Sequence, residues 1–241
     1  MSITTILQTF RRPDYLKSQV EAIRNQTIKS DKIIIVHNES EINFDFSEYK
    51  DCEIIYSSVN RKYHLRFAIG LLEKSDYLFF YDDDTTPGIE ATANFIETIE
   101  KYNSIAVGNG RSILPNYTQI CPAGWGVPKN TAVEVDFGGH LWACKREHLN
   151  YLWRETPINF GNGEDISFSA LAKIHGGIRT FVPPHPIDDR TKWSSLKGME
   201  YGADKNASYI NNPIHYQERI EIIKYYISKG WKPINFSPEN S

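Results

Sequence analysis

Three consecutive carboxylates, Asp82, Asp83 and Asp84, follow directly on the apolar and aromatic run at residues 77–81. An apolar run of this length that ends in a turn signal predicts a strand buried on both faces. Carboxylates crowded at its end repel one another and are costly to bury without a counter-charge. A hard divalent cation supplies that charge and takes oxygen ligands, so the stretch predicts a Mg²⁺ or Mn²⁺ site. Because ligands of open α/β sheets bind at the carboxyl ends of strands, we expect this site to hold a phosphate-bearing substrate.

A helix cap is the simpler interpretation of the same stretch. Asp84 or Thr86 suits the cap of a helix that Pro87 opens, because a side-chain oxygen there accepts a bond from a free backbone N–H. A cap needs only one of the three acids, and it does not need them behind a buried aromatic strand. A metal or diphosphate site is therefore the preferred interpretation.

Glu164 and Asp165 form a second acidic constellation, directly after the turn at residues 159–163. Acids at the start of a helix are favoured by the helix dipole alone, which is the simpler interpretation. The glycine in the turn supports a functional one, because Asn162-Gly163 allows the backbone to turn sharply and aim a carboxylate into a cleft. From the residues alone, both interpretations stay open.

The first half of the chain alternates β-rich and helical patterns, which indicates a largely parallel sheet with helices on its faces. The right-handed crossover rule makes a doubly wound sandwich the expected arrangement. Pro13 and Pro87 suit the first turns of two helices, and a third helix lies within residues 60–72. The predicted strands lie at residues 3–9, 32–37, 53–57 and 77–81.

The second half is less regular, because glycines and prolines between residues 106 and 135 predict loops and short strands. No linker separates the halves, so we expect one α/β domain over residues 1–241, with a smaller mixed sheet in its second half. The nucleotide-binding half extends to about residue 105 and the acceptor-binding half follows it. The predicted elements here are strands at 133–137 and 179–182, helices at 146–153, from 164 to the Gly176-Gly177 stop, and at 216–228, and a loop at 188–213.

The composition is that of an ordinary soluble globular protein, with 241 residues, 40% hydrophobic and 24% charged. A net charge of −3 argues against a broad nucleic-acid-binding surface. The three cysteines are widely spaced and fit neither a disulfide framework nor a zinc site, so we expect a reducing, cytoplasmic compartment. We expect neither a signal peptide nor a transmembrane segment, because no apolar run approaches the roughly 20 residues that a span needs.

Taken in chain order, these motifs resemble those of GT-A glycosyltransferases. The strand that ends in Asp82-Asp83-Asp84 resembles the Asp-x-Asp strand of that fold. Residues 7–12, Leu-Gln-Thr-Phe-Arg-Arg, resemble the Gln-Thr-Tyr-Asn-Arg of the exostosin-like transferases of family 64, and residues 161–166 resemble their Asn-Cys-Glu/Asp-Asp-Ile. The broader family-2 transferases share Asp-x-Asp and a Glu-Asp pair, so they remain an alternative. The resemblance covers nearly the whole chain.

The resemblance implies that a hexose or pentose is transferred from a nucleotide sugar, most simply a UDP-sugar, to an unidentified acceptor hydroxyl. Mn²⁺ or Mg²⁺ on Asp84 and Asp82 would neutralise the departing diphosphate. Asp165, with Glu164, would deprotonate the acceptor in an inverting enzyme, or position it in a retaining one, which is slightly favoured. The implied donor-binding residues are Gln8, Thr9, Arg11, Asn38, Asn60, Arg66, Asp82, Asp83 and Gly139.

Two features of the second half fit the resemblance less well. His185 is a third metal ligand if it follows some GT-A enzymes, but a structural histidine in a proline-flanked turn is the preferred interpretation. The exostosin-like His-Arg pair has no arginine counterpart near residues 199–205, where Lys205 is the available substitute. Two other functions stay open: a metal-dependent nucleotidyltransferase or phosphatase, and a non-catalytic nucleotide- or sugar-binding module.

Overall fold

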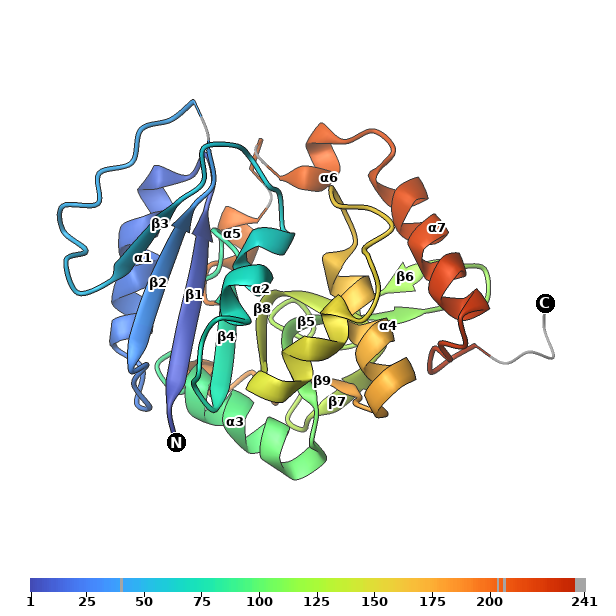
Figure 1. Cartoon of the computed structure of the whole chain (residues 1–241). Coiled ribbons are helices and arrows are strands. Elements are labelled where there is room, and N and C mark those ends of the chain that lie inside the picture. The colour runs from blue at the N-terminus through green and yellow to red at the C-terminus, as the bar shows by residue number, and fades with distance from the viewer. Residues whose placement is uncertain (40, 203, 206, 237–241) are drawn as a thin grey trace.

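The parallel strands of the first half form one continuous sheet, as their sequence patterns predict. Their carboxyl ends meet at the same edge, because β1 pairs in parallel with both β2 and β4, and β2 pairs in parallel with β3 (Figure 1). The computed structural model describes residues 1–39, 41–202, 204–205 and 207–236. The four strands are β1 (Ile3–Thr9), β2 (Lys32–His37), β3 (Glu53–Tyr56) and β4 (Tyr77–Tyr81).

Helices cover both faces of this sheet, which gives the expected doubly wound sandwich (Figure 1). Helices α1 (Pro13–Arg24) and α3 (Ala91–Tyr102) pack on one face, and α2 (His64–Gly70) packs on the other. Side chains alternate across a strand, so β4 contributes to both layers. Phe79 packs against Phe95 of α3, and Phe80 packs against Phe67 of α2. The prediction that β4 is buried on both faces is confirmed.

The second half supplies long antiparallel strands that the sequence pattern misses. Strand β5 (Ile105–Ile113) lies in the same sheet, so the prediction of loops and short strands over residues 106–135 is wrong at this point. Glycines inside a strand weaken the sequence pattern that predicts it. Here they are required, because neighbouring side chains leave no room for a Cβ atom. A Cβ atom on Gly110 would lie 2.6 Å from Cγ1 of Val135.

The predicted strand at residues 133–137 is in fact two strands. Strand β7 (Val133–Val135) pairs with β9 (Thr180–Val182), whereas β8 (Phe137–Lys145) begins at Phe137 and runs antiparallel between β4 and β5. The strand order is β3-β2-β1-β4-β8-β5-β9-β7, with the short β6 (Gln119–Ile120) beside β5. The mixed half of the sheet is thus joined to the parallel half through β8.

Helix α4 (Glu164–Gly176) begins and ends at its two predicted glycine turns, and α7 (His215–Ser228) packs against it. The helix predicted at residues 146–153 is a 3₁₀ helix, η1 (Arg146–Trp153). No helix within the described ranges is both long and apolar enough to span a membrane. The predicted loop at 188–213 contains three short helices, which are η2 (Arg190–Lys192), α5 (Gly198–Tyr201) and α6 (Ser208–Asn211).

The two glycines that flank α4 provide a matched test of its packing. Both have a left-handed backbone, with φ of +76° at Gly163 and +64° at Gly177. A Cβ atom on Gly163 would lie 2.4 Å from Cδ1 of Ile222 in α7, whereas one on Gly177 would meet nothing within 4 Å. We expect Gly177→Ala to lower the free energy of unfolding by about 1 kcal/mol, and Gly163→Ala by about 1–3 kcal/mol more. Equal losses in urea denaturation would contradict the α4–α7 contact.

Candidate active site

A cleft of about 980 Å³ opens at the carboxyl ends of the parallel strands, between the two halves of the chain. It receives side chains from both acidic constellations of the sequence. All of the predicted site residues line it except Thr9 and His185. The predicted residues in its lining are Gln8, Arg11, Asn38, Asn60, Arg66, Asp82, Asp83, Asp84, Gly139, Glu164 and Asp165.

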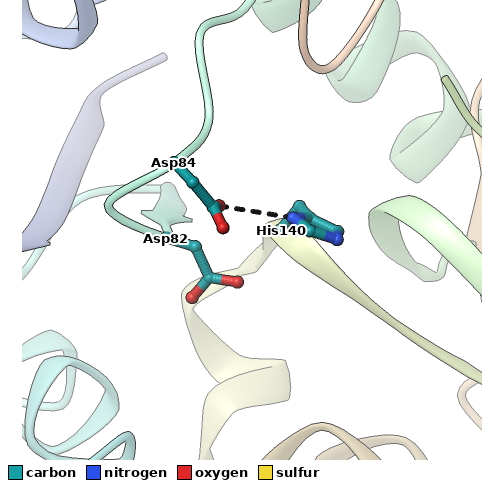
Figure 2. Close-up of side chains that lie close together, drawn as sticks. All are labelled: Asp82, Asp84 and His140. Atoms are coloured by element: carbon teal, nitrogen blue, oxygen red, sulfur yellow. Dashed lines mark hydrogen bonds and ion pairs between the residues drawn. The ribbon is translucent and has the colours of Figure 1, made fainter. Parts of the chain in front are cut away.

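Asp82 and Asp84 lie beside a histidine that was not predicted as a ligand, His140 of β8 (Figure 2). One ligand atom from each of the three residues lies within 4.8 Å of the others. The Nδ1 atom of His140 lies 3.4 Å from Oδ1 of Asp84. Such a group of two carboxylates and an imidazole can hold a divalent cation. The glycine pair directly before His140 is the only sequence signal that marked this position.

A β-bulge aims His140 toward the aspartates. In the pairing of β5 with β8, Val107 lies opposite Trp142 and Asn109 lies opposite Gly139, so two residues of β8 face Gly108 alone. A bulge of this kind bends the strand and redirects a side chain. His140 has φ of +70°, a conformation that is uncommon for a residue with a side chain and that clusters at functional sites.

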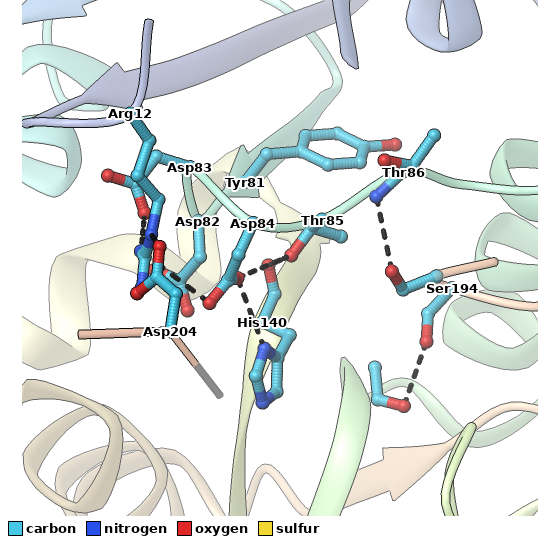
Figure 3. Close-up of polar contacts among 12 residues, drawn as sticks. Arg12, Tyr81, Asp82, Asp83, Asp84, Thr85, Thr86, His140, Ser194 and Asp204 are labelled. Carbon is cyan, nitrogen blue, oxygen red and sulfur yellow. Dashed lines mark hydrogen bonds and ion pairs between the residues drawn. The ribbon is translucent and has the colours of Figure 1, made fainter. Parts of the chain in front are cut away.

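Arg12, at the start of α1, is the buried counter-charge of the aspartates (Figure 3). Its guanidinium contacts Asp83, and its Nη1 lies 3.6 Å from Oδ2 of Asp84. Its Nε and Nη2 donate to the two carboxylate oxygens of Asp204 at 2.9 and 2.8 Å. The sequence prediction chose its neighbour Arg11, which lines the cleft but pairs with the exposed Glu41 at 3.3 Å.

Burial and neighbouring charges distinguish two of the aspartates. Burial raises the pKa of Asp83 to about 7, against the opposing charge of Arg12. Burial also acts on Asp84, but the hydrogen bond with His140 and the charge of Arg12 outweigh it and hold the pKa of Asp84 below its ordinary value. At His140, burial is outweighed by the same hydrogen bond, which raises the pKa of the imidazole. Asp84 is therefore more readily ionised than Asp83.

The donor set and its charge both fit a divalent cation. Within the described residues, the structure places two arginines, Arg12 and Arg66, against the four acids at residues 82–84 and 204. A divalent cation suits such an excess of carboxylates. The two carboxylates supply the oxygen ligands that Mg²⁺ and Mn²⁺ take, and His140 adds an imidazole nitrogen.

Arg66 of α2 connects the two acidic constellations. Its Nη1 contacts Asp82, and its Nη2 lies 3.6 Å from Oε1 of Glu164. The guanidinium lies over the ring of Trp142, 4.5 Å from the ring centroid. Its side chain is only 2% exposed, and its Nε and Nη2 have no hydrogen-bond partner within the described residues. An arginine with unused donors at a cleft suits a phosphate or carboxylate ligand.

The second constellation stands at the first turn of α4, where Gly163 turns the backbone into the helix. Both predicted acids are buried and line the cleft. The helix dipole favours acids at this position as well, so the structural and the functional interpretations do not exclude each other. Asp165 accepts hydrogen bonds from Nη1 and Nη2 of Arg219 at 3.1 and 2.7 Å. Arg219, in α7, is a buried partner that the sequence prediction missed.

The environment of Glu164 raises the pKa of its carboxyl group. Burial raises the pKa of Glu164 to about 8, and the adjacent charge of Asp165 adds to the effect, while Arg66 opposes it. Glu164 therefore keeps its proton over the neutral range. A group with a pKa near the working pH suits proton transfer.

The predicted donor-side asparagines shape a loop at the cleft edge. The Asn38 amide donates to the carbonyl of Lys62 at 2.9 Å, and its Oδ1 accepts from the backbone N–H of Arg61 at 3.1 Å. The Oδ1 of Asn60 accepts from the backbone N–H of Lys62 at 2.9 Å. Gln8 is buried, and its Oε1 has no partner in the described part of the chain. These side chains therefore position the loop, and Gln8 keeps a free acceptor.

Three residues named from the sequence lie outside the cleft lining. Thr9 is buried at the end of β1, and its Oγ1 lies 3.3 Å from Nδ1 of His37. His185 is buried between Pro183, whose carbonyl lies 2.8 Å from Nδ1, and Ser194, whose Oγ lies 2.8 Å from Nε2. Both of its ring nitrogens are thus used within the fold, as the structural interpretation predicts. Lys205 is exposed.

Comparisons with known proteins agree with this geometry. Residues 4–147 match the family model of glycosyl transferase family 2. The fold is similar to the crystal structure of S. aureus TarS 1-349, with a TM-score of 0.58 and 15% identity, over 100% of this chain and 74% of that chain. No curated protein matches the chain. At this identity the likeness shows the GT-A fold alone, and the narrower exostosin-like resemblance stays a prediction.

A metal site at Asp82, Asp84 and His140 would bind Mn²⁺ in a pH-dependent way. A proton on His140 competes with the ion, and the raised pKa of His140 extends this competition to higher pH. We expect the affinity measured by titration calorimetry to rise between about pH 5.5 and about pH 8, and His140→Gln to lower it about tenfold or more. His175→Gln, at the far end of α4, is the control variant. An affinity that is equal at both pH values would contradict ligation by His140.

The buried Glu164 predicts a pH dependence of stability. The folded protein keeps this proton up to about pH 8, whereas an unfolded chain releases it near the ordinary pKa of about 4.3. The unfolded state therefore binds fewer protons between these values, and the free energy of unfolding falls as the pH rises through this window. We expect Glu164→Gln to flatten this slope by at most about 1.4 kcal/mol per pH unit. Parallel wild-type and variant curves in urea denaturation would contradict the assignment.

Proposed function

The chain belongs to glycosyl transferase family 2, and from this premise we propose that it transfers a sugar from a nucleotide sugar, UDP-linked in the simplest case, to an acceptor hydroxyl in a metal-dependent reaction. One observation carries the proposal. The Asp82, Asp84 and His140 group and the Glu164–Asp165 pair line the same cleft, and Arg66 bridges them. A diphosphate bound at one group and a hydroxyl at the other would meet within that cleft.

The first half would bind the donor. Asp84, Asp82 and His140 would hold the ion, which when bound supplies Lewis-acid compensation for the charge of the departing diphosphate. The unused donors of Arg66 would contact diphosphate oxygens, because a guanidinium matches their geometry. Gln8 and the loop that Asn38 and Asn60 hold would face the nucleotide.

The acid pair would act on the acceptor. Asp165, fixed in orientation by Arg219, would align the hydroxyl and accept its proton, while Glu164, which keeps its own proton up to about pH 8, would help to position the acceptor. A base at this place in a single displacement gives inversion at the anomeric carbon. Retention, which the exostosin-like resemblance favours, would leave the pair to position the acceptor. The anomeric configuration of the product distinguishes the two outcomes.

A donor screen tests the proposal directly. We expect metal-dependent release of UDP from at least one UDP-sugar, measured with and without Mn²⁺. Asp84→Ala should weaken Mn²⁺-dependent UDP binding, because it removes a metal ligand. Asp165→Ala should keep that binding and lower the rate of transfer by about 10²-fold or more.

The surface acid Asp51, which pairs with Arg24 away from the cleft, provides the control variant. Asp51→Ala should keep full activity, because an exposed ion pair adds little stability. Full transfer by Asp84→Ala or Asp165→Ala would overturn the assignment. Turnover of a nucleoside triphosphate in place of the sugar nucleotides would instead indicate a nucleotidyltransferase.

A further inference from the structure

The wall of the cleft beside Asp165 comes from the segment 207–219, which lies outside the family-matched residues. Figure 1 shows its helices, α6 and the start of α7, next to each other and to the right of the parallel strands. Two tyrosines of this segment line the cleft and are exposed to solvent. Tyr209 is 44% exposed and Tyr216 is 61% exposed. Open aromatic rings at a cleft are suited to ligand contact.

Internal hydrogen bonds hold this wall in place. The Asn162 amide donates to the carbonyl of His215 and to Oε2 of Glu218, both at 3.0 Å. The Asn212 amide donates to the same Glu218 oxygen at 2.7 Å. The backbone on both sides of Tyr216 is therefore tied to the turn that precedes the acid pair. A ring on such a support loses little freedom when it binds a ligand.

The wall also lies close to the Glu164–Asp165 pair, where an acceptor would have to bind. Tyr216 and Arg219 are three residues apart on α7, so they share one helix face. Arg219 holds both carboxylate oxygens of Asp165. A ligand that stacks on Tyr216 therefore lies about one helical turn from the acid pair.

The chemistry of the wall indicates a neutral, ring-shaped ligand. The charged side chains of this segment, Glu218 and Arg219, are bonded within the fold, and residues 209–216 contain no acidic or basic side chain apart from His215. Burial lowers the pKa of His215, so this residue is neutral near pH 7. Tyrosine rings stack on the apolar faces of sugar rings, and their hydroxyls hydrogen-bond at the edges. A polyanion or an acidic membrane surface would instead require lysines or arginines.

We propose that Tyr209 and Tyr216 form an acceptor subsite for a neutral carbohydrate, which stacks on these rings and presents a hydroxyl to the Glu164–Asp165 pair. The proposal rests on the proposed glycosyl transfer and names the acceptor class of that reaction. It also gives the segment 207–219 a function: this segment selects the acceptor, while the family-matched residues hold the donor.

The test uses two readouts on the full chain. Binding to a microarray of neutral oligosaccharides is measured with UDP and Mn²⁺ present, and UDP release from the donor is measured separately. We expect Tyr209→Ala and Tyr216→Ala to weaken glycan binding about tenfold each. Their UDP–Mn²⁺ affinity should equal that of the wild type, because neither tyrosine belongs to the Asp82, Asp84 and His140 group. Tyr216→Phe should keep most of the binding, because it keeps the ring.

Tyr56→Ala is the matched control, because this tyrosine is 66% exposed on β3 and does not line the cleft. Glycan binding by the Tyr209 and Tyr216 variants that equals that of Tyr56→Ala would overturn the subsite. Binding of the wild type to phosphatidylcholine and phosphatidylglycerol vesicles, without binding to glycans, would overturn it as well. Tyrosine-dependent glycan binding without any donor turnover would support the subsite and contradict the proposed transfer.

Discussion

Buried carboxylates shape the cleft, and they are tolerated because buried arginines face them. Moving an unpaired charge out of water costs several kcal/mol even after the protein relaxes. Arg12 faces Asp83 and Asp84, Arg66 faces Asp82 and Glu164, and Arg219 faces Asp165. The fold must therefore place three arginines around one cleft, one directly before α1 and the others in α2 and α7. This requirement constrains the ends of α1, α2 and α7 together.

The same ion pairs join the two halves of the chain. Arg12 contacts Asp204, and Arg66 lies beside Glu164, so each of these two arginines pairs with an acid of the second half. Apolar packing holds the sheet and the α4–α7 layer together. At the cleft itself, ion pairs connect the two halves. A charged ligand in the cleft therefore changes the electrostatic interactions between the two halves as well as those within the site.

Local sequence patterns predict the parts of this structure that depend on interactions between residues close in sequence. The apolar run of β4, the glycine turns of α4 and most of the acidic lining follow from residues that are close in sequence. Strand β5 was missed, because glycines required by packing against β7 look like loop residues. Arg12, His140 and Arg219 were also missed as site residues. Their partners lie 192, 56 and 54 residues away, and no local pattern reports such pairs.

The division between the matched and unmatched parts of the chain has a physical basis. The family-matched residues contain the whole Asp82, Asp84 and His140 group and also Arg12 and Arg66, so the features suited to a metal and a diphosphate lie there. The acid pair and its arginine lie beyond residue 147 and reach the cleft through α4 and α7. In the proposed reaction a hydroxyl acceptor would offer little charge, so the unmatched wall would have to select it by shape and stacking. Electrostatic contacts would serve many sugar nucleotides, whereas a rigid aromatic wall would discriminate among acceptors because each ring fits only some of them.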